Sequence, residues 1–160
     1  MDALSQMYAH LGLDNVKTYL QSGNVVFEAE EQDVLEIENL ICQQIKQDFG
    51  YDVPVLVFDA DTLEQIVISN PFLNDKSKDI SFFHVTFLSP MSEISNFEEI
   101  GKKKQGDEEI ILKDSMIYLY CPNGYGRTKL TNNFIESKLK MMATTRNWKT
   151  VNELLKIAKQ

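Results

Sequence analysis

The two arginines of this 160-residue chain, Arg127 and Arg146, both lie between residues 120 and 148, whereas its lysines are spread along the whole sequence. An arginine guanidinium is a planar and always-charged donor, so it can hold a carboxylate or phosphate with two hydrogen bonds. Both arginines stand beside turn-forming and aromatic residues, in the runs Gly-Tyr-Gly (124–126) and Asn-Trp (147–148). The stretch indicates either an anion site or two arginines that each pair with a carboxylate elsewhere in the chain.

The glycine-containing run before Lys129 could act as a small nest of backbone amides for an anion. Its spacing is not that of a Walker loop, because the Gly-Lys-Ser/Thr sequence is missing. An ordinary loop from a strand to a helix explains the same residues. The ligand-binding residues predicted for an anionic or phosphorylated small molecule are Arg127, Lys129, Arg146, Asn147, Tyr125, Ser22 and Asn24.

Several of these residues have a structural explanation beside the functional one. Ser22 and Asn24 belong to the run Gln-Ser-Gly-Asn, and a hairpin turn favours such residues whether or not a ligand binds. Trp148 could be a core anchor between two helices, in which case Arg146 pairs with a carboxylate. Turn chemistry is the favoured explanation for Ser22 and Asn24. For Arg146, ligand binding and pairing with a carboxylate both stay open.

Residues that would mark catalysis or a metal site are sparse. His84 alternates with Phe82 and Thr86 in a strand-like run, which favours a packed, hydrogen-bonded histidine over a general base. Cys42 and Cys121 lack metal-like spacing and are typical of two reduced thiols in the cytosol. The sequence thus predicts no metal and no cofactor, and it leaves open whether any reaction is catalysed.

The charge distribution is uneven. Residues 1–112 carry a net charge of −14 and residues 113–160 a net charge of +6, within a total of −8. This asymmetry favours two halves that attract each other, and the acidic total argues against general nucleic-acid binding. Nucleic acid stays an alternative ligand, because Tyr118 and Tyr120 alternate on a predicted strand and could stack bases. The sequence contains neither a signal peptide nor a long apolar run, so we expect a cytoplasmic protein that does not span a membrane.

Hydrophobic periodicity predicts one α+β domain made of two ferredoxin-like, or split βαβ, halves. The halves cover about residues 1–71 and 80–160, and a polar loop at 72–79 separates them. The elements predicted from apolar spacing and turn residues are helices at 2–11, 31–48, from 61, from 95, from 131 and from 150, hairpins at 16–28 and 110–120, and strands at 53–58 and 80–88. A strand that should precede residue 2 in the first half is absent.

Three motifs occur in order: Thr-Tyr-Leu-Gln-Ser-Gly-Asn-Val-Val-Phe (18–27), Tyr-Gly-Arg-Thr-Lys-Leu (125–130) and Thr-Thr-Arg-Asn-Trp-Lys-Thr-Val (144–151). With these motifs the chain resembles a bacterial family known as domain of unknown function 1697 (DUF1697), from about residue 3 to its end. The resemblance implies an α+β fold of ferredoxin-like units and a cytoplasmic location. It implies no established activity.

The chain departs from this family at its start. Members usually open with a strand and a glycine-rich loop similar to Arg-Gly-Ile-Asn-x-Gly-Gly, and this chain begins at the helix that follows. An enzyme that needs this loop is a further alternative for the function. The absent strand would leave open edges at residues 24–28 and 53–58, and open edges invite pairing with other chains. We therefore expect the gap to be filled by another segment or by self-association, or the two edges to close on each other.

Overall fold

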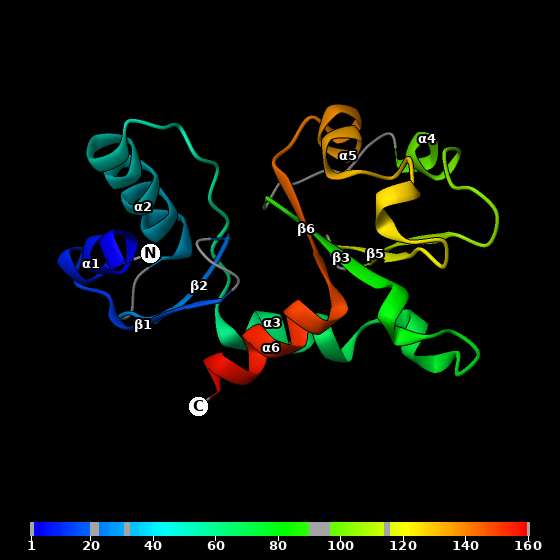
Figure 1. Cartoon of the computed structure of the whole chain (residues 1–160), viewed down its shortest axis with the longest axis horizontal. Coiled ribbons are helices and arrows are strands. Elements are labelled where there is room, and N and C mark those ends of the chain that lie inside the picture. The colour runs from blue at the N-terminus through cyan, green and yellow to red at the C-terminus, as the bar shows by residue number, and fades with distance from the viewer. Residues whose placement is uncertain (1, 20–22, 31–32, 90–96, 114–115, 160) are drawn as a thin grey trace. The chain divides into compact units, whose positions relative to one another are not determined.

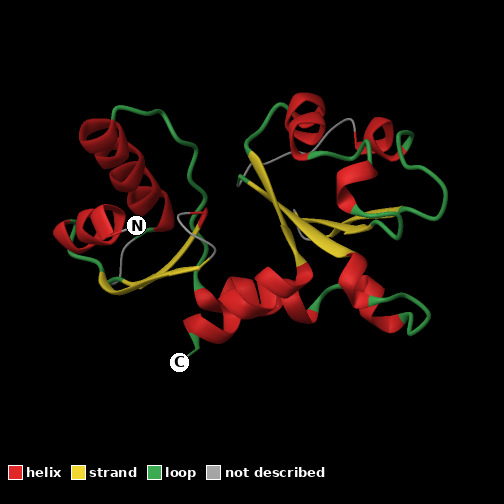
Figure 2. Ribbon diagram, viewed as in Figure 1, coloured by secondary structure: helices red, strands yellow, loops and turns green. Residues whose placement is uncertain are grey.

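The chain folds into helices and antiparallel strands in an α+β arrangement (Figures 1 and 2). The computed structural model describes residues 2–19, 23–30, 33–89, 97–113 and 116–159. It contains two compact units, of which the first comprises residues 1–64 and 153–160 and the second residues 65–152. The polar loop at 72–79 thus belongs to the second unit, and the end of the last helix belongs to the first.

The first unit contains a two-stranded antiparallel sheet with helices before and after it. Its elements are α1 (Asp2–His10), β1 (Asp14–Tyr19), β2 (Asn24–Glu28), α2 (Val34–Phe49) and the first part of α3 (Ala60–Ile68). The hairpin predicted at 16–28 is confirmed, because β1 pairs with β2. Residues 20–22, which include Ser22 at the predicted tip, lie outside the described residues.

The core of the first unit forms around α2. Ile37, Ile41 and Ile45 form an apolar stripe that is buried along one face of this helix. Asp33 caps the helix start by accepting a hydrogen bond from the Leu35 backbone N–H at 3.0 Å. The residues that complete this core come from α1, both strands and the segment after α2: Met7, Tyr8, Leu13, Val16, Val25, Phe27, Val55 and Val57.

The second unit contains a four-stranded antiparallel sheet in the order β4-β5-β3-β6. Its elements after α3 are η2 (Pro71–Asn74), η3 (Ile80–Phe82), β3 (Phe83–Leu88), α4 (Phe97–Gly101), β4 (Glu109–Lys113), β5 (Met116–Tyr120), η4 (Tyr125–Arg127), α5 (Asn132–Leu139), β6 (Ala143–Asn147) and α6 (Trp148–Ala158). The sequence β-α-β-β-α-β from β3 to β6 has the split βαβ element order. Its last strand, β6, is an element that the sequence did not predict.

The two faces of this sheet are covered by different elements. Helices α4 and α5 cover one face, and the core there consists of Leu88, Ile100, Ile117, Leu119, Cys121, Leu130, Ile135, Leu139, Met141 and Ala143 (Figure 1). On the other face, the hydroxyl of the buried Tyr118 donates to the Ile66 carbonyl at 2.7 Å. Phe83 there lies edge-on to both Tyr120 and Trp148. We call these the helix face and the aromatic face.

Residues 53–58 are not a strand, contrary to the sequence prediction. Residues 53–58 follow α2 in the first unit, and the corresponding segment of the second unit, after α5, is β6. This segment is a strand because it pairs with β3. A strand equivalent to β3 is missing from the described part of the first unit, whose sheet contains only β1 and β2. Strand formation depends on a pairing partner more than on intrinsic propensity, so these residues stay extended without a ladder. The ferredoxin-like arrangement predicted for the first half is therefore not observed there.

Two predicted helix starts are also corrected. Helix α3 begins at Ala60 rather than Asp61, because Asp59 accepts a hydrogen bond from the Thr62 backbone N–H at 2.7 Å. Helix α6 begins at Trp148 rather than Thr150, and the Asn147 side chain accepts from the Thr150 N–H at 2.8 Å. In both cases an Asx oxygen earlier in the chain satisfies the free amides of the first turn. None of the described helices has both the length and the apolar character needed to cross a membrane.

Candidate functional site: a clipped cationic loop

The loop that connects β5 to α5 is closed on itself by a hydrogen bond. The hydroxyl of Tyr125 accepts this bond from the backbone N–H of Asn132, the first residue of α5, at 2.9 Å. The loop starts at Gly124, whose φ of 93° is one that favours glycine. Between the two ends, the buried Thr128 accepts a hydrogen bond from the Leu130 N–H at 3.1 Å. We call residues 124–132 the clipped loop.

The clipped loop is fixed to the helix face of the sheet at two points. The ring of Tyr125 stacks on the imidazole of His84 in β3, with centroids 4.8 Å apart and planes 27° from parallel. At its other end, the Asn132 side-chain oxygen accepts a hydrogen bond from the Thr145 hydroxyl at 3.3 Å. That hydroxyl also bonds to the hydroxyl of the buried Thr86, at 2.8 Å. Contacts to β3 and β6 therefore hold both ends of the loop.

Two cationic side chains extend from the clipped loop into solvent. Arg127 and Lys129 are both exposed, and neither forms an ion pair with any residue that the structure describes. The alternative in which Arg127 pairs with a carboxylate is thus not realised within the described ranges. Two neighbouring cations on a loop with a fixed base can contact one anion together.

Arg146 lies on the opposite side of the sheet. In β6 it pairs with Val85, whereas the next residue, Asn147, pairs with His84 beneath Tyr125. Because side chains alternate between faces along a strand, Arg146 belongs to the aromatic face. Its Nη1 donates to the Thr144 hydroxyl at 2.7 Å, and burial lowers the pKa of the guanidinium. The register thus separates Arg146 from the clipped loop.

The remaining predicted residues fall in different places. Asn147 ends β6 on the helix face and caps α6, so it shares a face with Tyr125. Asn24 belongs to the first unit, where its side chain donates to the Tyr19 carbonyl at 3.2 Å across the hairpin. This bond supports the turn explanation for Asn24. Tyr125, Arg127 and Lys129 lie on the same loop because they are close in the sequence.

Of the aromatic residues considered for stacking nucleic-acid bases, Tyr118 is buried and Tyr120 is half-buried. Tyr118 is 1% exposed and Tyr120 is part of the aromatic cluster with Phe72 and Phe83. Stacking of bases on a sheet requires rings that are open to solvent. The arrangement of this face therefore does not support the nucleic-acid alternative.

His84 differs from its sequence prediction in one respect. Its ring is packed, as predicted, but its Nδ1 atom is buried and forms no hydrogen bond. Burial also lowers the pKa of His84, because the charged form would lose its hydration. The ring is thus a neutral imidazole directly below the base of the clipped loop.

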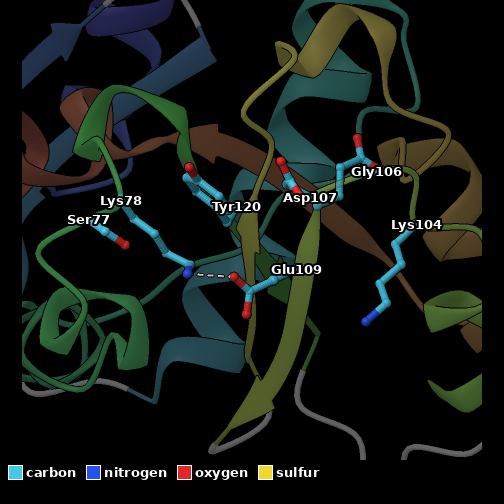
Figure 3. A pocket seen from close by; sticks show the side chains of 8 residues that line it. Ser77, Lys78, Lys104, Gly106, Asp107, Glu109 and Tyr120 are labelled. Atoms are coloured by element: carbon cyan, nitrogen blue, oxygen red, sulfur yellow. Dashed lines mark ion pairs between the residues drawn. The ribbon is translucent and has the colours of Figure 1, made fainter.

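An open pocket of about 440 Å³ lies in the second unit, near the start of β4 and the end of β5 (Figure 3). Lys78 forms one wall: its Nζ lies 2.6 Å from the Glu109 carboxylate and 5.1 Å from the centre of the Tyr120 ring. Its hydrogen bond to Asp75 lowers the pKa of that carboxyl to about 2. Sequence reasoning missed this pocket, because its walls come from loops whose contacts depend on tertiary packing.

Among the described residues, no group of three or more His, Cys, Asp or Glu side chains could hold a metal ion. The fold and the clipped loop together define an α+β protein with an exposed cationic loop between β5 and α5.

The chain belongs to the family described as protein of unknown function (DUF1697), whose model matches residues 1–118. No curated protein matches the chain. A similar solved structure is that of the conserved bacterial protein SP0830 from Streptococcus pneumoniae, with a TM-score of 0.68 and 17% sequence identity. The match covers 99% of this chain and 88% of that one. At this identity the likeness shows the fold alone.

Proposed function

We propose that the chain binds an anionic small molecule, such as a phosphorylated metabolite, at the clipped loop. The observation that carries this proposal is the pair of exposed cations, Arg127 and Lys129, that lack ion-pair partners among the described residues. Arg127 would supply the planar fork that grips two oxygens, and Lys129 would supply a point charge.

The closed base of the loop supports binding, because ordering a flexible loop would otherwise oppose it. The Tyr125–Asn132 hydrogen bond and the stack on His84 fix the loop before any ligand arrives. The cations also lie in the part of the sequence with a net charge of +6, residues 113–160. A phosphate therefore meets a fixed, positively charged surface.

We expect Arg127→Ala to weaken binding of inorganic pyrophosphate roughly tenfold to a hundredfold, because a hydrogen bond to a charged group contributes about 1.5–3 kcal/mol. Arg127→Lys should restore only part of the affinity, since the charge returns without the fork. Isothermal titration calorimetry measures both effects. Lys102→Ala, at another exposed lysine of the second unit, is the matched control. Equal losses for the Arg127→Ala and Lys102→Ala variants would contradict the assignment.

We further propose that the chain self-associates through the first unit. This proposal is supported by the sheet there, in which β2 has a single neighbouring strand, β1, within the described residues. Edges of this kind pair readily with strands of other chains. Sedimentation velocity over a range of protein concentrations should show a dimer. A monomer at every concentration would contradict it.

The location of the protein in a bacterial cytoplasm is likewise a proposal. Both cysteines, Cys42 and Cys121, are free thiols in the structure. Burial raises the pKa of Cys121 to about 11, which keeps this thiol protonated and unreactive. Unpaired thiols of this kind are typical of proteins in a reducing compartment.

A further inference from the structure

His84 is a half-buried titratable residue that the proposed anion site does not use directly. Its Nδ1 atom is buried without a hydrogen-bond partner, although most buried polar atoms in proteins have one. The groups that face its ring from the packed elements are Leu119 on β5, Asn147 on β6 and Tyr125 on η4. None of these three side chains is charged at neutral pH. A proton on His84 would thus meet no neutralising carboxylate among them.

We propose that His84 is a positioning residue of the clipped loop, and that its protonation strengthens anion binding by Arg127 and Lys129. The part of this inference that concerns the anion rests on the proposed function. The part that concerns the loop does not, because it follows from the stack of His84 on Tyr125.

The geometry supports both the positioning role of His84 and its effect on anion binding. Tyr125 is the residue that closes the loop through Asn132, so the plane of the His84 ring sets where the base of the loop lies. A protonated imidazole would be attracted to the face of the Tyr125 ring. It would also add a positive charge on the side of the loop that faces the sheet. An anion bound to the loop and a proton on His84 therefore stabilise each other, and this coupling is reciprocal.

The sign of the pH dependence follows from the environment of the ring. Burial lowers the pKa of His84 in the ligand-free protein, and the nearby Phe82 backbone, which favours the charged form, opposes this shift only in part. The residue is therefore neutral at pH 7. A bound anion favours the charged form, so its binding takes up a proton. Anion affinity should therefore rise as the pH falls toward the lowered pKa of His84.

Sulfate is a suitable probe, because it stays a dianion throughout this pH range and does not titrate with the protein. We expect the wild-type chain to bind sulfate at least about fivefold more tightly at a pH below the lowered pKa of His84 than at neutral pH, as for ordinary site-to-site coupling. His84→Phe keeps a flat ring against Tyr125 but cannot take up a proton. The sulfate affinity of this variant should show no increase as the pH falls. His84→Ala removes the ring and should bind more weakly at both values.

The chain has two histidines, and the other one provides a matched control. His10 is exposed in the first unit, so His10→Gln should keep the full pH dependence. Circular dichroism verifies that each variant is folded. A His84→Phe protein that retains the increase, or a wild type that binds sulfate equally tightly at both pH values, would overturn the proposal.

A second measurement needs no ligand. In NMR spectra of the free protein, the amide signals of Gly124 and Gly126 should shift along the titration curve of the His84 ring. The same signals should stay fixed in the His84→Phe protein. If the wild type bound no sulfate at any pH, the proposed function would fail, and these amide signals would still decide whether His84 positions the loop. Amides that do not follow the ring would overturn that role.

Discussion

Replacing Trp148 by alanine is expected to lower the free energy of unfolding by about 3–5 kcal/mol, as for other large truncations in protein cores. The indole is 6% exposed and lies edge-on to Phe83, with centroids 6.3 Å apart. It also begins α6 directly after β6 ends at Asn147. The cavity left by alanine would therefore remove contacts to the aromatic face at the point where a strand passes into a helix.

Urea unfolding followed by circular dichroism measures this effect without relying on the single tryptophan. Trp148→Phe is the control, because it keeps an aromatic ring beside Phe83 and should cost clearly less than alanine. A loss below about 1 kcal/mol for Trp148→Ala would contradict a core role and would instead indicate an exposed platform for a ligand.

Replacing Ile41 by alanine is expected to cost about 2–5 kcal/mol, because it creates a cavity in the core of the first unit. Ile41 is fully buried on α2, between the stripe positions Ile37 and Ile45. Its neighbour Leu40 is 43% exposed on the same helix. Ile41 and Leu40 thus allow two truncations of similar size at adjacent positions, one in the core and one at the surface.

Leu40→Ala should lie within about 0.5–1 kcal/mol of the wild type, as for most substitutions at the surface. The comparison requires the same urea unfolding experiment for both variants. Equal losses at the two positions would mean that α2 presents a different face to the core than the structure shows. A large loss at Leu40 alone would indicate that another surface covers it.

The elements with regular apolar spacing could be predicted from the sequence. Helix α2 repeats isoleucine at helical intervals between an acidic cap and Gly50, and the helix predicted at 31–48 is observed at Val34–Phe49 with these isoleucines buried. The first hairpin and β3 are likewise runs of β-branched and aromatic residues, although β3 begins at Phe83 because residues 80–82, predicted as the start of this strand, form the 3-10 helix η3. Local periodicity carries this information, because it reflects which face of an element is buried.

Strands that depend on a partner could not be predicted. Strand β6 has the sequence Ala-Thr-Thr-Arg-Asn, which lacks apolar alternation, and it forms because β3 offers an edge. Residues 53–58 show the converse, since they are strongly apolar but lack strand pairing in the described structure. In both cases the tertiary context overrides the intrinsic preference of the segment.

The candidate site was predictable only in part. The composition around Arg127 pointed to the loop, and Lys129 was correctly placed on it. Two contacts of the loop could not be predicted. The hydrogen bond from the Asn132 N–H to the Tyr125 hydroxyl has no recognisable sequence pattern, and the stack of Tyr125 on His84 joins residues that are distant along the chain. Arg146 lies on the opposite face of the sheet from the clipped loop because of the register between β6 and β3. This register could not be predicted, since β6 itself was not predicted.

The most direct test of the anion site is a phosphate titration followed by two-dimensional ¹H–¹⁵N NMR of the wild-type chain. We expect amide shift changes concentrated at residues 124–131, and their loss in the double variant Arg127→Glu and Lys129→Glu. Lys102→Glu with Lys103→Glu changes the net charge by the same amount at another exposed loop, and should leave the response intact. Shift changes elsewhere, or an unchanged response in the Arg127 and Lys129 variant, would contradict the account.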